Sequence, residues 1–173
     1  MMLADDACRP LQPTQDWPFF DADCHVAPEL LAQVHALTPQ AAAQVWRRHV
    51  SAHADETHPM RLCKGHRLAQ GMAGPAWQQQ FDAVSTAHPA QEGSVAQFLA
   101  RHFHASDEAP VFFMASRVLA YALTPAALAA CWPCLLMLSD EGPLLYQPAT
   151  GRFACFRPQG QLAAGEDRSA RYP

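Results

Sequence analysis

Charged side chains are scarce in this chain of 173 residues: they make up 16% of it, and lysine occurs once, at Lys64. The 12 basic and 16 acidic residues give a formal net charge of −4. The longest basic run is the pair Arg47 and Arg48, which is too short to form the basic surface that binds a phosphate backbone. The composition therefore excludes nucleic acid as an expected partner.

Long apolar runs are also absent. No stretch of about 18 uninterrupted apolar residues occurs, which a membrane-spanning helix needs. The beginning, MMLADDACRP, has no basic segment followed by an apolar one, as a signal peptide would. These absences predict a cytoplasmic protein without a membrane partner.

The sequence contains none of the common catalytic signatures. It has no G-x-S-x-G motif, no glycine-rich phosphate loop, no H-E-x-x-H motif and no papain-like cysteine context. Their absence favours a protein that is not an enzyme and that needs no cofactor.

The hydrophobic half of the composition is enough for one core, and the chain is too short for two domains of ordinary size. We expect an α+β fold with helices packed on a mainly antiparallel sheet of four to five strands. The single domain is predicted over residues 17–157. Residues 1–16 and 158–173 carry proline, glycine and charge without apolar periodicity, so both are expected to be flexible tails.

Helical periodicity and capping residues place most of the helices. Thr38 followed by Pro39 is a typical helix start, and Ala42, Val45, Trp46, His49 and Val50 then fall on one face. Apolar spacing predicts further helices over residues 28–35, after Pro75 and from Ser94 to Phe103.

Short apolar runs at 111–115, 135–138, 143–146 and 152–156 predict strands, and the first two suggest strands covered on both faces. A helix is expected from Thr124 to Cys131, because Pro133 disfavours helical geometry at Trp132.

Two groups of cysteine and histidine residues could carry chemistry. His49, His53, Cys63 and His66 supply ligands that zinc prefers, within 18 positions. They define the alternative hypothesis of a zinc-binding domain or a metal-dependent enzyme. Cys131 and Cys134 have the spacing of a redox dithiol or half a zinc site, but their apolar surroundings favour buried thiols, as does the absence of a disulfide framework among the six cysteines.

The order of features resembles a bacterial family catalogued as domain of unknown function 2947. The resemblance rests on a Trp-ended helix at 38–46, a Trp-containing segment at 77–81, an aromatic strand at 111–115, a second Trp-ended helix at 124–132 and the hairpin DEGPLLY at 140–146. It covers most of residues 15–157, and it implies no catalytic residue. The later half is also similar in style to α+β immunity proteins, which block bacterial toxins.

That second similarity leads to the expected function. We expect a non-catalytic module that binds a protein partner, most concretely a toxin or effector, through the acidic residues Asp107, Glu108, Asp140 and Glu141. A further hypothesis makes the chain a subunit of an assembly, with Trp17, Phe19 and Phe20 as an exposed anchor; the alternative is that these aromatic residues fold over the core.

Overall fold

The computed structural model of the chain describes residues 5–69, 78–80, 89–103, 109–139, 142–157 and 161–167. The described helices are η1 Asp5–Ala7, η2 Trp17–Phe19, α1 Pro28–Leu31, α2 Pro39–His49, η3 Pro59–Arg61, α4 Pro89–His102 and α5 Pro125–Leu136. The strands are β1 Cys8–Arg9, β2 Val34–Leu37, β3 Gln78–Gln80, β4 Val111–Met114, β5 Ala120–Leu123, β6 Leu144–Gln147, β7 Arg152–Arg157 and β8 Gln161–Glu166. Within this part of the chain, none of the helices has the length and apolar character to cross a membrane.

The strands form one sheet in the order β1-β2-β5-β4-β6-β7-β8-β3, and every pairing between neighbours is antiparallel. The described residues thus confirm an antiparallel α+β fold. They contain eight strands, so the expected number of four to five is wrong. Strands β1, β2, β3 and β8 lie where the sequence suggested tails or helices, and β5 lies where it predicted no element.

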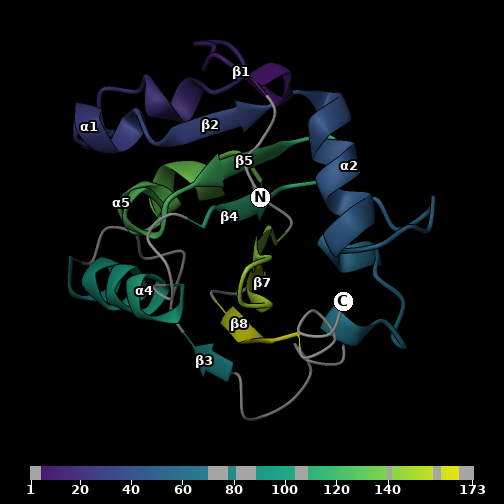
Figure 1. The fold of residues 1–173 in the computed structure, drawn as a ribbon. Coiled ribbons are helices and arrows are strands. Elements are labelled where there is room, and N and C mark those ends of the chain that lie inside the picture. The colour runs from purple at the N-terminus through teal and green to yellow at the C-terminus, as the bar shows by residue number, and fades with distance from the viewer. Residues whose placement is uncertain are drawn as a thin grey trace.

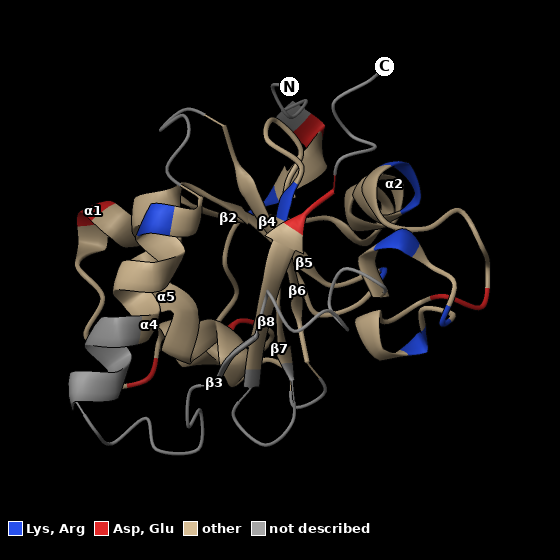
Figure 2. Cartoon of the chain, turned by 90° about the horizontal axis from the view of Figure 1, so that it is seen from below, with Lys and Arg blue, Asp and Glu red and all other residues tan. Residues whose placement is uncertain are grey.

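Helices cover both faces of this sheet. Helices α1, α4 and α5 lie on one side and α2 lies on the other (Figures 1 and 2). Side chains of β4 alternate between the two layers: Val111 and Phe113 belong to the core under α4 and α5, whereas Phe112 and Met114 belong to the core under α2. All four are buried, which confirms the expectation of a strand covered on both faces.

Helix α2 begins as the sequence predicts. The Thr38 hydroxyl accepts a hydrogen bond from the Ala41 amide at 3.3 Å, and Pro39 occupies the first turn. At the other end, Trp46 is fully buried and its Nε1 donates to the Glu56 carbonyl at 2.7 Å. This hydrogen bond therefore fixes the loop that follows α2 against the helix.

Helix α5 differs from its prediction. It continues through Pro133 to Leu136, so the predicted strand at 135–138 is wrong. A proline inside a helix costs about 3 kcal/mol. The burial of Cys134 and Leu135 against the sheet-facing core returns about 1.5–3 kcal/mol for a leucine side chain alone.

Three other helical segments also differ from expectation. The helix expected at 28–35 ends at Leu31, and β2 follows it directly at Val34. Residues 78–80 form β3, whereas a helix was expected after Pro75. Helix α4 is confirmed, but it starts at Pro89 rather than at residue 94.

The segments expected to be flexible tails contribute to the fold. Strand β1 pairs with β2, and Asp16 has no exposed surface. Strand β8 pairs with β7 and with β3, and Asp167, which follows it, is buried. Backbone pairing stabilises both segments, and in β8 the buried side chains of Leu162, Ala163 and Ala164 also belong to the core.

Candidate functional site

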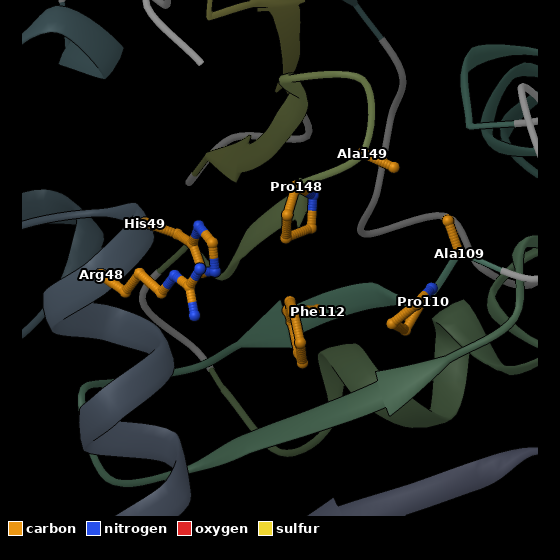
Figure 3. A pocket seen from close by; sticks show the side chains of 7 residues that line it. All are labelled: Arg48, His49, Ala109, Pro110, Phe112, Pro148 and Ala149. Carbon is orange, nitrogen blue, oxygen red and sulfur yellow. The ribbon is translucent and has the colours of Figure 1, made fainter. Parts of the chain in front are cut away.

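A pocket of about 270 Å³ opens at the carboxyl-terminal end of helix α2. It is lined by Arg48, His49, Ala109, Pro110, Phe112, Pro148 and Ala149. Figure 3 shows the side chains of Arg48 and His49 reaching from the last turn of α2 towards Phe112 and Pro148. The walls are mostly apolar, and the polar groups come from one helix turn.

The sheet brings the walls of this pocket together. Phe112 pairs with Tyr146 in the register of β4 and β6, so Pro110 and Pro148, each two residues further along, come to the same end of the sheet. The Gln147 side chain is buried and donates to the carbonyls of Phe103 and Ala109 at 3.0 and 3.3 Å. These hydrogen bonds fix the chain on the side of the pocket that lies opposite α2.

The imidazole of His49 packs against two aromatic rings of the sheet. Its centroid lies 6.3 Å from that of Phe112 and 5.8 Å from that of Tyr146, and both pairs are stacked. Burial, followed by the positive charges of Arg48 and Arg67, lowers the pKa of His49 to about 4. His49 is therefore neutral at pH 7, with one ring nitrogen as donor and the other as acceptor.

One atom of this histidine has no hydrogen-bond partner. Nε2 of His49 is buried, and it makes no hydrogen bond within the described residues. An unsatisfied buried polar atom costs about 1–3 kcal/mol, and native proteins contain few of them. A group that bonds to this nitrogen would recover that free energy.

Arg67 holds the end of α2 beside the pocket. Its guanidinium donates to the carbonyls of His49 and Val50 at 2.6 and 3.0 Å, and its Nε pairs with Asp167 at 2.7 Å. Helix ends leave such carbonyls without intrahelical partners. Arg67 therefore satisfies the helix terminus and fixes the backbone from which His49 projects.

The structure separates the four residues of the metal hypothesis. His49 is stacked on the sheet, His53 and Cys63 are exposed, and a ring nitrogen of His66 lies 2.9 Å from the Val50 carbonyl oxygen. Across the part of the chain that the structure describes, no group of three or more His, Cys, Asp or Glu side chains is arranged to hold a metal ion. The geometry therefore offers nothing in support of the zinc alternative.

Asp107, Glu108, Asp140 and Glu141 lie outside the described residues, so the acidic partner site stays a prediction. The nearest described neighbours of the two pairs are Ala109 and Gly142. These neighbours lie at opposite ends of the β4–β6 pairing, because Met114 is opposite Leu144 and Phe112 is opposite Tyr146.

The aromatic residues proposed as an anchor are divided. Phe19 is buried and contacts Tyr121 edge to face, with ring centroids 5.9 Å apart. Trp17 and Phe20 are 43% and 52% exposed. The hypothesis that these residues fold over the core thus holds for Phe19.

The buried carboxylates that the structure describes are bound by other protein groups. Asp16 binds Arg9 and Tyr121, and Asp167 binds Arg67. Glu56 accepts hydrogen bonds from the Ser51 hydroxyl and the Cys63 amide, and these hydrogen bonds lower its pKa to about 2. These arrangements stabilise loops, and none of these carboxylates lines the pocket.

Sequence reasoning noted His49 on the apolar face of α2 but missed its neighbours in the pocket. Pro110, Pro148 and Ala149 come from turns that meet only through the register of the sheet, so no local pattern marks them. Arg48 gave a signal only as half of the longest basic pair.

Comparison with known proteins gives a family but no characterised relative. No curated protein and no solved structure matches the chain significantly. The sequence profile of the family described as "Protein of unknown function (DUF2947)" matches residues 11–165. The match begins at Leu11, shortly after β1, and ends at Gly165 in β8. It includes all residues that line the pocket. The chain therefore belongs to the DUF2947 family, as the resemblance indicated.

Proposed function

We propose that the protein is a non-catalytic binding module and that its pocket receives a carboxylate group of a protein partner. The observation that carries this proposal is the unpartnered Nε2 of His49, which lies beside the cationic Arg48 in an apolar pocket. The proposal keeps the expected function, protein binding, and assigns it to a surface that the structure describes.

The size of the pocket limits what it can hold. Its volume of about 270 Å³ is below the ~300–1,000 Å³ of typical small-molecule sites. A nucleotide or a large cofactor would exceed it, whereas one side chain or chain end fits. A group with so few atoms binds only weakly by itself. A polypeptide that carries this group supplies additional contacts outside the pocket.

The polar groups select the chemistry of the bound group. A guanidinium such as that of Arg48 binds carboxylates with two parallel hydrogen bonds. His49, which is neutral in the unliganded pocket, adds one hydrogen bond to the carboxylate, and the negative charge of the bound group favours protonation of the imidazole. A ligand oxygen reaches Nε2 when the imidazole turns about its Cβ–Cγ bond, a soft torsion for a planar ring.

The apolar walls complete the description of the ligand. Pro110, Phe112 and Pro148 offer no charge and no side-chain hydrogen bond, so they favour a short aliphatic stem behind the carboxylate. The described lining residues include no serine, cysteine or acidic side chain. Apart from the imidazole of His49, these residues provide groups for binding and no hydroxyl, thiol or carboxylic acid for catalysis.

The proposal is tested by calorimetric titration with two pairs of probes. Butyrate is compared with butyramide, and an acetylated Ala-Ala-Val tripeptide with a free carboxylate is compared with its carboxyl-terminal amide. We expect both acids to bind and both amides to fail, with the tripeptide acid binding more tightly. Equal binding of acids and amides would refute the carboxylate assignment, and butyrate binding as tightly as the tripeptide would indicate a free small acid instead.

Two arginine variants locate the binding. Arg48→Ala should weaken binding of the acids by about 10- to 100-fold, because a hydrogen-bonded charge contributes about 1.5–3 kcal/mol. Arg47→Ala is the matched control, since Arg47 is exposed on the same helix turn and does not line the pocket. The same loss in both variants would mean that general charge, and not the pocket, attracts the acids.

The more specific expectation of toxin inhibition stays a hypothesis. It is supported by the acidic net charge. The cytoplasmic location likewise stays a prediction from the sequence. Capture of a toxin-like partner whose chain end is needed for binding would connect the pocket with that function.

A further inference from the structure

The thiols of Cys24 and Cys134 are in contact although 110 positions separate them in the chain. Their Sγ atoms lie 2.9 Å apart, within about 1 Å of the bonded separation in a disulfide. Cys134 lies in helix α5, and Cys24 lies in the turn before α1, where its amide donates to the Asp21 carbonyl at 3.0 Å. Two distant segments thus present their sulfur atoms to each other.

A third thiol belongs to the same cluster. Cys131 lies one helix turn before Cys134 on α5 and is fully buried. Burial and then the proximity of Cys24 raise the pKa of Cys131 to about 12. Cys131 and Cys134 belong to the apolar core on the α5 side of the sheet, and the partly buried Cys24 packs against that core.

We propose that Cys24 and Cys134 are a modification site at which a reversible intramolecular disulfide forms by exchange with a small disulfide such as glutathione disulfide. First the thiolate of Cys24 attacks the small disulfide, forms a mixed disulfide and releases one small thiolate. The thiolate of Cys134 then attacks the Cys24 sulfur, and the second small thiolate leaves. Two protein thiols are oxidised, one small disulfide is reduced to two thiols, and the two protons pass to solvent and the released thiolates.

The order of attack follows from accessibility. Cys24 is half-buried, whereas Cys134 is 7% exposed and Cys131 has no exposed surface. Burial, followed by the hydrogen bond with Cys24, raises the pKa of Cys134. Little of the Cys134 thiol is therefore ionised at neutral pH. Exchange therefore begins at Cys24, and Cys134 acts as the resolving thiol because it is already in contact.

The bond would fasten the amino-terminal segment to the opposite half of the chain. Residues 5–27 reach the core through η2 and through the turn at Cys24, and α5 lies in the middle of the core layer on that face. A cross-link across such a long loop restricts the unfolded chain strongly. The oxidised form should therefore unfold at a higher temperature than the reduced form.

The test uses the full chain, reduced and then incubated with glutathione disulfide below its melting temperature. We expect peptide mapping by mass spectrometry to find a peptide that joins Cys24 and Cys134 and lacks two hydrogen atoms. We also expect the melting temperature to rise on the order of 5 °C and to return after addition of dithiothreitol. Mapping is done on the unchanged protein, so the result does not depend on a variant that folds.

Variants separate this pair from the other thiols. Cys63→Ser should keep the cross-link, because Cys63 is exposed and belongs to another loop. Cys134→Ser should abolish it and leave glutathione attached at Cys24. A product joined through Cys131, or a protein modified only at Cys63, would overturn the proposal.

Discussion

Arg9 and Asp16 form a two-pronged ion pair that fixes the amino-terminal segment on the sheet. Nη1 and Nη2 of Arg9 lie 2.6 and 2.9 Å from the two carboxylate oxygens of Asp16. The Tyr121 hydroxyl, on β5, donates to the same carboxylate at 2.5 Å. Burial opposes the charge of Asp16, but the hydrogen bonds from Arg9 and Tyr121 outweigh it and lower the pKa of Asp16.

Replacement of Asp16 should destabilise the protein strongly. Asp16→Ala leaves the Arg9 guanidinium, which is only 15% exposed, without its partner, and breaking such a pair costs about 3–5 kcal/mol. Urea unfolding measures the loss. Asp23→Ala is the control, because Asp23 is exposed and its removal should change the free energy of unfolding by less than about 0.5 kcal/mol. Equal effects of the two variants would refute the role given to the ion pair.

Gly142 should tolerate no side chain. Its φ is +79°, and an added Cβ would lie 2.5 Å from the Phe156 carbonyl oxygen, a backbone atom that cannot move away cheaply. Gly142→Ala should therefore lower the free energy of unfolding by about 2 kcal/mol or more. Gly65→Ala is the matched control, because nothing lies within 4 Å of the added carbon. Thermal unfolding of both variants checks the prediction, which fails if they melt together.

The free energy of unfolding should decrease as the pH is lowered from 6.5 towards 4, because His49 titrates in this range. The folded pKa of about 4 lies below the ordinary value of 6.5, so the unfolded chain takes up the proton first. The contribution of neutral His49 to the free energy of unfolding is fully present above pH 6.5. It is lost as the pH falls towards 4, and the loss is on the order of 2 kcal/mol. Urea unfolding at a series of pH values measures it.

His49→Phe is the variant that isolates this contribution. It keeps an aromatic ring between Phe112 and Tyr146 and removes the unsatisfied Nε2, so it should be at least as stable as the wild type at pH 7. The slope between pH 6.5 and 4 should decrease. It should not vanish, because burial also lowers the pKa of His102. An unchanged slope would show that His49 does not titrate in this way.

Carboxylate binding should strengthen as the pH falls from 7.5 to 5.5. A bound carboxylate favours the charged imidazole and raises the pKa of His49 from about 4, so the complex takes up protons. Butyrate remains mostly ionised in this range, because carboxyl groups have pKa values near 4. Titration at several pH values tests this. His49→Phe should bind butyrate more weakly and without the pH dependence, and a variant with the wild-type profile would contradict the prediction.

Local signals in the sequence predicted those parts of the fold that local chemistry decides. Thr38 and Thr124, each followed by proline, cap helices as expected. Their hydroxyls accept hydrogen bonds from the amides of Ala41 and Ala127 at 3.3 and 3.2 Å. The strand at 111–115 and its cover on both faces were also predicted correctly from an apolar run, whereas the similar run at 135–138 begins in the last turn of helix α5.

Tertiary contacts decided the rest. Pro133 is compatible with a helix because the turn after it is buried, and no local rule reports that burial. β1 and β8 are stabilised by backbone pairing with distant strands. The same reason applies to the candidate sites. His49 was visible on its helix, but Pro110 and Pro148 meet only through the register of the sheet. The contact of Cys24 with Cys134 likewise depends on the packing of segments that are far apart in the sequence.

The shortest strands of the described sheet are at its edges. β1 has two residues and β3 has three, so an incoming chain finds few free backbone groups there, a feature by which native sheets avoid edge-to-edge aggregation. The Arg9–Asp16 pair fixes the segment that forms β1. Release of that segment would turn β2, a longer strand with buried Val34, Ala36 and Leu37, into an open edge. We therefore expect loss of the ion pair to favour edge-to-edge association through β2.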